Sequence, residues 1–129
     1  MAHKSFHFLI VDDIIMNRIL LKEITSPFAA RVFEAENGKE AIAILEENHI
    51  DVIMMDIEMP VMNGVETTRH IRNKLIDPKD KTTIIALTAH NPDDFFEDYH
   101  SAGFDELLTK PYSFDKITNI LSSLNIADK

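Results

Sequence analysis

The sequence contains no cysteine and no tryptophan, and it has only three glycines and fewer basic than acidic residues. The absence of cysteine excludes disulfides, thiolate nucleophiles and cysteine-ligated zinc. With 13 Lys and Arg against 22 Asp and Glu, the formal net charge is −9. Direct nucleic-acid binding is not expected, because it needs a basic surface to displace counterions from phosphates. The excess of carboxylates favours a cation site or basic partners.

Long hydrophobic runs are also missing. The apolar run before the first acidic pair is too short for the core of a signal peptide, and no other segment approaches the length of a membrane span. We therefore expect a cytoplasmic protein without membrane contact. A chain of 129 residues, 45% hydrophobic and 27% charged, suits one globular domain, so we expect a single domain over residues 1–129.

Short apolar segments rich in β-branched residues alternate with longer segments of helical period. This pattern is typical of parallel strands joined by crossover helices. The predicted strands are Phe6–Val11, Arg31–Ala35, Asp51–Met55, Thr83–Leu87 and Glu106–Leu108. The sequence therefore predicts an α/β fold, with a doubly wound five-stranded parallel sheet of flavodoxin-like strand order 2-1-3-4-5 and helices on both faces.

Several helix starts are marked by their residues. Asn37 with Glu40, and Asn63 with Glu66, resemble capping boxes, and the segment Asn91–Asp94 predicts a further start. The first helix is expected from about Ile14 to Ser26. Two apolar stripes at helical spacing are interpreted as core, which is the commoner role of such stripes. They comprise Met16, Leu20 and Ile24 in the first helix and Phe114, Ile117, Leu121 and Leu124 in the last.

Polar side chains follow four of the predicted strands. Asp12 and Asp13 follow the first strand, Asp56 the third, Thr88 the fourth and Lys110 the fifth. In the order 2-1-3-4-5 they converge at the edge of the sheet where ligands bind. Three close carboxylates repel one another unless a cation neutralises them, and oxygen ligands without Cys or paired His favour Mg²⁺.

The same edge suits phosphoryl transfer. Asp56 ends the central strand and is best placed to accept a phosphoryl group. Lys110 would supply a point charge to the phosphoryl oxygens, and the hydroxyl of Thr88 would bond to another of them.

The order of these motifs resembles the receiver domain of two-component response regulators, over essentially the whole chain. The motifs are the acidic pair, DIEMPVMNG from Asp56 to Gly64, IIALTA from Ile84 to Ala89, and Lys110 followed by Pro111. The likeness is greatest to receivers of hybrid sensor histidine kinases. The resemblance implies a phosphorelay protein, not an ordinary enzyme, whose partner is a histidine kinase or a histidine phosphotransfer protein.

The resemblance also assigns roles to single residues. It makes Asp56 the phosphoacceptor, and it places Mg²⁺ on Asp12, Asp13, Asp56 and the backbone carbonyl of Glu58. It assigns phosphoryl contacts to Thr88 and Lys110. Further implied features are a small Ala89 that leaves room for the phosphodonor and a cis peptide bond between Lys110 and Pro111.

In the family, phosphorylation switches a face built from helix four, strand five and helix five. That face is also where we expect a homodimer to form, and Phe95 or Phe96 is a candidate contact on it. Two positions depart from the family pattern. Leu107 replaces an aromatic residue that takes part in the switch of many receivers, and Ile14 stands where many have Asn.

Other interpretations stay open on the sequence. Asp13 alone could be a helix cap, and Asp56 alone a turn residue. A Mg²⁺-dependent phosphatase with an aspartyl nucleophile is a second function, although its usual DxD motif and cap insertion are not found. A third is an adaptor that works without phosphorylation. No output domain is expected, so the chain is a stand-alone receiver or part of a longer protein.

Overall fold

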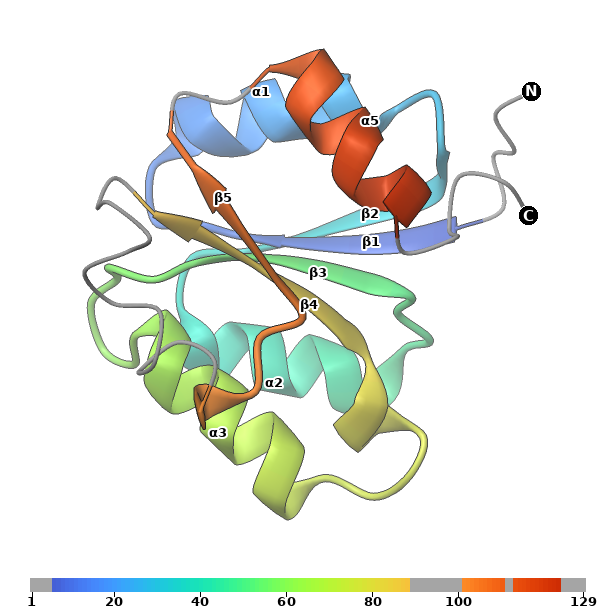
Figure 1. The fold of residues 1–129 in the computed structure, drawn as a ribbon. Coiled ribbons are helices and arrows are strands. Elements are labelled where there is room, and N and C mark those ends of the chain that lie inside the picture. Colours follow the sequence, from blue (N-terminus) through green and yellow to red (C-terminus); the bar gives the residue numbers. More distant parts are fainter. Residues whose placement is uncertain (1–5, 89–100, 111–112, 124–129) are drawn as a thin grey trace.

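The structure is a computed structural model that describes residues 6–88, 101–110 and 113–123. Its five strands form one parallel sheet in the order β2-β1-β3-β4-β5, as predicted (Figure 1). The strands are β1 (Phe6–Val11), β2 (Ala29–Ala35), β3 (Val52–Asp56), β4 (Thr83–Thr88) and β5 (Glu106–Thr109). β3 thus extends to the proposed acceptor itself, one residue beyond the predicted end.

Helices cover both faces of the sheet. α1 (Ile15–Thr25) and α5 (Phe114–Ser123) lie on one face, and α2 (Gly38–Glu47) and α3 (Gly64–Lys74) lie on the other (Figure 1). A short 3₁₀ helix, η1 (Lys79–Lys81), precedes β4. The helix start predicted at Asn91–Asp94 lies outside the described residues. No helix in the described ranges is long and apolar enough to cross a membrane.

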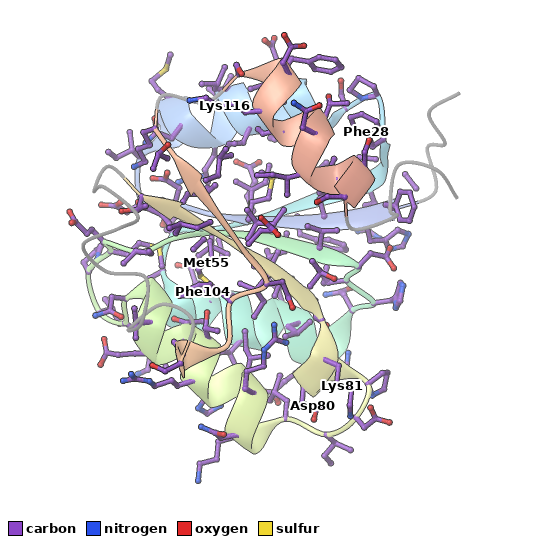
Figure 2. The ribbon with its side chains drawn as sticks, viewed as in Figure 1. Phe28, Met55, Asp80, Lys81, Phe104 and Lys116 are labelled. Atoms are coloured by element: carbon purple, nitrogen blue, oxygen red, sulfur yellow. The ribbon has the colours of Figure 1, made fainter. Side chains whose placement is uncertain are left out.

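The central strands are buried on both sides, which explains their continuous apolar runs. Successive side chains of β3 point to opposite faces, so Met54 packs toward α1 and α5 while Met55 packs toward α2 and α3. Figure 2 shows the two layers, with Phe28 on one side of the sheet and Met55 and Phe104 on the other. The resulting core packs the central strands on both sides up to the carboxyl edge of the sheet.

The predicted caps of α2 and α3 are present, with one difference. Asn63 and Glu66 form a complete capping box, in which each side chain bonds the backbone N–H of the other residue. Asn37 accepts a hydrogen bond from the backbone of Glu40, but the carboxylate of Glu40 accepts from the N–H of Glu36. The second half of the α2 box is therefore shifted by one residue.

The interpretation of the α1 stripe as core was wrong for Met16 and Leu20 and correct for Ile24, which is partly buried and packs against the core. Met16 is 67% exposed and Leu20 is 42% exposed, whereas Arg18, Leu21 and Thr25 form the buried face. Apolar residues occur on several sides of the first two turns of α1, so helical periodicity alone could not tell which stripe faces the sheet. In α5, Ile117 and Leu121 are buried as predicted.

Phe114, the first member of the α5 stripe, is 48% exposed. Its ring stacks on that of Phe28 with 6.3 Å between the centroids. The side chain therefore covers the edge of the core from outside. Leu124 lies outside the described residues.

Candidate functional site

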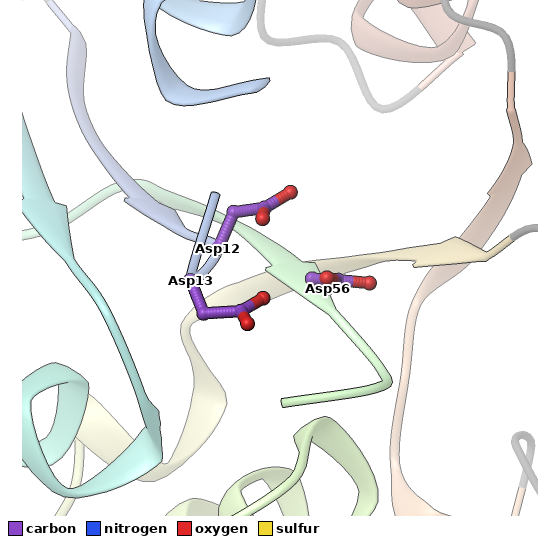
Figure 3. Close-up of side chains that lie close together, drawn as sticks. All are labelled: Asp12, Asp13 and Asp56. Atoms are coloured by element: carbon purple, nitrogen blue, oxygen red, sulfur yellow. The ribbon is translucent and has the colours of Figure 1, made fainter. Parts of the chain in front are cut away.

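Three carboxylates meet at the carboxyl edge of the sheet. β1 and β3 are parallel neighbours, with Val11 paired to Met55, so the residues that follow them lie side by side. Asp12, Asp13 and Asp56 each offer an oxygen, and these oxygens all lie within 4.8 Å of one another (Figure 3). Asp12 and Asp56 are buried and Asp13 is exposed. The convergence predicted from the strand order is confirmed.

The turn after β1 orients the carboxylate of Asp12. The Asp12 N–H donates to the carbonyl of Ala35 on β2, and the Ile14 N–H donates to Oδ1 of Asp12 at 2.9 Å. Oδ2 of Asp12 is buried and has no hydrogen-bond donor among the described residues. A buried carboxylate oxygen without a donor is costly in free energy unless a cation satisfies it. The donor set therefore fits a hard divalent cation such as Mg²⁺.

The alternative that Asp13 is a helix cap is wrong. The N-cap residue of α1 is Ile14, and no side chain makes a capping hydrogen bond there. The Asp13 carboxylate lies beside Asp12 and Asp56 instead (Figure 3). The helix-cap interpretation therefore gives way to a role in the acidic cluster.

Lys110 and Thr88 lie on the other side of Asp56. The Lys110 Nζ is 3.5 Å from Oδ1 of Asp56, and the Lys110 N–H donates to the carbonyl of Thr88 at 2.8 Å. Thr88 is buried at the end of β4. A cleft of about 190 Å³ opens over these groups. Its lining residues are Asp13, Ile14, Asp56, Ile57, Glu58, Thr88 and Lys110.

The position of Asp56 changes its acidity. Burial, and after it the negative charge of Asp12, raises the pKa of Asp56 to about 6. Lys110 and a hydrogen bond from the backbone of Glu58 act in the opposite direction. Removal of the carboxylate from water and its closeness to Asp12 both disfavour the anionic form, and a bound cation would offset both effects.

The loop after β3 brings the start of α3 against Asp56. The Gly64 N–H donates to the carbonyl of Ile57, and a Cβ on Gly64 would lie 2.5 Å from the carbonyl oxygen of Asp56. Only glycine allows this close approach. Within the same loop, Val61 has a positive φ of 70°, which is unfavourable for a β-branched residue.

The remaining predicted site residues have different outcomes. Glu58 is exposed and lines the cleft, while its N–H bonds to Asp56. Leu107 is partly buried against the core beside α2 and α3. Four further predictions lie outside the described residues. They concern Ala89, Phe95, Phe96 and the Lys110–Pro111 peptide bond.

Two apolar residues of the cleft were not predicted from the sequence. Ile14 and Ile57 line it next to the carboxylates. Ile14 directly follows Asp13, and Ile57 directly follows Asp56. Their position next to proposed metal ligands could have identified them as cleft residues. Arg18, also missed, is a buried cation in contact with the same turn.

Residues 8–122 match the response regulator receiver domain family. The chain belongs to this family. Receiver domains are signalling modules of two-component systems and not enzymes in the ordinary sense, and the match covers both the sheet and the acidic cluster. The interpretation from the order of the sequence motifs is thus confirmed.

Relatives of this receiver occur in much longer proteins. It is 34% identical over 124 residues to stress response regulator protein 1 of Lodderomyces elongisporus, covering 91% of this chain and 33% of that protein. It is 34% identical over 116 residues to hybrid signal transduction histidine kinase A of Dictyostelium discoideum, covering 88% of this chain and 5% of the kinase. The likeness to receivers of hybrid kinases is therefore confirmed.

Solved structures agree with the fold. One similar structure is the receiver domain of a sensor histidine kinase of Pseudomonas aeruginosa, with a magnesium ion coordinated in the active-site cleft of that domain. It is 28% identical to this chain with a TM-score of 0.80, and the match covers 92% of this chain and 95% of that one. A chain in the co-crystal of the Saccharomyces cerevisiae phosphotransfer protein Ypd1 with the receiver domain of Ssk1 is 26% identical with a TM-score of 0.83. That match covers 95% of this chain and 90% of that one.

Proposed function

We propose that this receiver accepts a phosphoryl group from a phosphohistidine onto Asp56 in a Mg²⁺-dependent reaction. The observation that carries the proposal is the meeting of Asp12, Asp13 and Asp56 within 4.8 Å, with Lys110 3.5 Å from Asp56. These are the carboxylates for a cation, an acceptor oxygen and a fixed positive charge in one small cleft. We further propose that residues 1–129 form a single receiver domain located in the cytoplasm.

In the proposed step, a carboxylate oxygen of Asp56 attacks phosphorus in line with the leaving group. The bond between phosphorus and the donor's imidazole nitrogen breaks, and its electron pair leaves with the imidazole. Asp12, Asp13, Asp56 and the Glu58 carbonyl would hold Mg²⁺, which when bound neutralises the phosphoryl oxygens. This ligand set follows the family pattern and is supported by the unpaired Oδ2 of Asp12 and by the magnesium in the Pseudomonas receiver.

Lys110 and Thr88 act on the product side of the same step. Lys110 pairs with Asp56 before transfer, and after transfer its ammonium is within reach of the phosphoryl oxygens. Thr88 supplies a hydroxyl at the end of β4. Because β4 and β5 pair there, movement of Thr88 toward the phosphate would be transmitted to the face beyond.

The apolar surface at the start of α1 is where we place the phosphodonor. Five large apolar side chains are exposed there, and one of them also lines the cleft. They are Ile14, Ile15, Met16, Ile19 and Leu20. A helix of a histidine phosphotransfer protein or kinase could cover this α1 surface while its histidine reaches Asp56. The pairing of a related receiver with Ypd1 supports this class of partner.

The face of helix four, strand five and helix five remains the proposed output and homodimer face. Its helix four lies outside the described residues, so the case for that face rests on the family resemblance.

The proposal is tested by incubating the protein with Mg²⁺ and acetyl phosphate and measuring its intact mass. We expect the gain of one phosphoryl group, no gain in excess EDTA, and no gain for Asp56→Asn. Asp115→Asn, an exposed carboxylate in the first turn of α5, is the matched control and should be labelled like the wild type. A phosphoryl group retained by Asp56→Asn would overturn the assignment.

Two competing functions give different results. An aspartyl phosphatase would release phosphate from a generic phosphomonoester over many turnovers. An adaptor that works without phosphorylation would bind its partner equally well before and after Asp56→Asn. Unchanged partner binding by that variant would favour the adaptor.

A further inference from the structure

Arg18 is a nearly buried cation between the acidic turn and β2. Its side chain is 9% exposed. Nη1 donates to the backbone carbonyl of Asp12 at 2.8 Å, and Nε donates to Oε1 of Glu34 at 3.0 Å. We propose that Arg18 is a positioning residue, which holds the Asp12–Asp13 turn in the geometry that binds Mg²⁺. The inference rests on the Mg²⁺ site of the proposed function.

The geometry of the guanidinium suits this role. Its planar fork points one N–H at the turn and another at a carboxylate on β2, so it links two separate parts of the backbone. The Asp12 N–H is bonded to Ala35 on the same strand. The turn is thus held to β2 through both its amide and its carbonyl. A lysine has no fork and could not make both contacts with the same geometry.

The charges around Arg18 allow a cation so close to a metal site. Glu34 pairs with Nε, and Oε1 of Glu36 lies 3.8 Å from Nη2. These carboxylates balance the guanidinium, so its main effect on the turn is directional. Without such balance, Arg18 would repel Mg²⁺ and its removal would strengthen binding. Loss of the directional contact would weaken Mg²⁺ binding, whereas loss of charge repulsion would strengthen it. The sign of the change in Mg²⁺ affinity therefore distinguishes the two effects.

Lys22 offers a matched control on the next turn of α1. Its Nζ bonds Oε2 of the same Glu34 at 3.0 Å, and its side chain is 45% exposed. In the described part of the chain, its recorded contact is with Glu34 and not with the acidic turn. Lys22→Met therefore removes a cation from the same carboxylate while leaving the Asp12 carbonyl bonded.

The experiment is calorimetric titration of Mg²⁺ alone into the wild type, Arg18→Lys, Arg18→Met, Glu34→Gln and Lys22→Met. We expect both Arg18 variants to bind Mg²⁺ about tenfold more weakly, at the lower end of the effect of residues that support metal ligands. The Mg²⁺ affinity of Glu34→Gln should lie between that of the Arg18 variants and that of the wild type, because Arg18 stays but loses its ion pair with Glu34. Lys22→Met should stay close to the wild type.

Two results would overturn the inference. One is a folded Arg18→Met that binds Mg²⁺ as tightly as the wild type or more tightly. The other is an equal loss of Mg²⁺ affinity in Lys22→Met, which would show that overall charge, and not the contact of Arg18 with the turn, controls Mg²⁺ binding. If the wild type itself does not bind Mg²⁺, the proposed function fails as well, and this outcome is distinct from the other two.

Hydrogen exchange at the Ile14 amide provides a second readout, independent of metal. This N–H bonds to Oδ1 of Asp12 and reports the geometry of the turn. We expect faster exchange at Ile14 in Glu34→Gln, which keeps Arg18 and so is the variant best able to fold. Lys22→Met should exchange at the wild-type rate. Unchanged exchange in Glu34→Gln would contradict a positioning role.

Discussion

The ammonium of Lys110 lies 3.5 Å from the carboxylate of Asp56, although Asp56 ends β3 and Lys110 follows β5, and β4 lies between these strands. The Lys110 backbone is held to the end of β4 by its bond to Thr88. The positive charge is therefore fixed relative to Asp56 before any phosphoryl group arrives. Such preorganisation is the main contribution a protein can make to phosphoryl transfer.

Lys110→Met should slow phosphorylation of Asp56 by acetyl phosphate on the order of 100-fold, because a fixed charge at the reacting oxygens is lost. It should also raise the pKa of Asp56 above its value of about 6, since Lys110 lowers that pKa in the wild type. Rapid-quench mass measurements and carboxyl ¹³C NMR would test the two effects. Lys116→Met, on α5, is the control. An unchanged rate would remove Lys110 from the proposed step.

Asp56→Asn should stabilise the protein without Mg²⁺ at pH 7.5 by about 1–3 kcal/mol. Burial and Asp12 raise the pKa of Asp56 from 3.8 to about 6, so the folded chain holds this proton more tightly than the unfolded chain. Stability of the wild type therefore falls as pH rises from about 4 to about 6, by up to about 3 kcal/mol.

The asparagine variant lacks this titration, so its advantage should disappear near pH 4. Urea unfolding from pH 4 to 7.5 would measure both proteins. If the free energies of unfolding of the wild type and Asp56→Asn changed with pH in parallel, the expectation would be contradicted. Saturating Mg²⁺ should stabilise the wild type more than the variant, because Asp56 is one of the proposed ligands.

Gly64→Ala should destabilise the protein by about 2–4 kcal/mol. The new Cβ would lie 2.5 Å from the Asp56 carbonyl oxygen and 2.9 Å from the Cα of Ile57, and backbone atoms cannot move aside as a side chain can. Chemical denaturation would measure the loss. Mg²⁺ binding should weaken too, because α3 must shift away from Asp56. If Gly64→Ala were as stable as the wild type, the loop after β3 would have to relax without cost around the new Cβ.

Val61→Gly should stabilise the fold by about 1 kcal/mol. The positive φ of Val61 costs about 1–3 kcal/mol for a β-branched residue, and this exceeds the entropic penalty of glycine. Val65→Gly, the same change inside α3, should have the opposite sign because its backbone is helical. Equilibrium unfolding of both variants gives the comparison, and a loss of stability in Val61→Gly would contradict the strain argument.

Met16→Asp should weaken phosphoryl transfer from a phosphohistidine donor by about tenfold or more while leaving labelling by acetyl phosphate unchanged. Met16 is exposed on the α1 surface, and a charge there would be buried against the docked donor. Ile76→Asp, at a site 82% exposed after α3, is the matched control and should leave both reactions unchanged. Equal loss with both phosphodonors would place the defect in the cleft instead of the docking surface.

Much of the molecule could be predicted from local sequence. Near-continuous apolar runs predicted the central strands β1, β3 and β4, since strands buried on both faces are mostly apolar. The edge strand β2 is exposed at several positions and begins at Ala29, two residues before its predicted start. The Asn63 box determined the start of α3, because the capping contacts are made within one turn. Given the strand order, the chain also determined that Asp12, Asp13, Asp56, Thr88 and Lys110 gather at one edge.

Tertiary structure decided what depends on contacts between distant segments. The sequence could not tell which stripe of α1 is buried, because that choice depends on how Arg18 meets Glu34 on β2 and the Asp12 carbonyl. It could not show that Asp56 is buried enough to have a pKa of about 6, or that Ile14 joins the α1 surface to the cleft. Desolvation, charge proximity and surface continuity arise only when separate elements come together, and no local pattern encodes them.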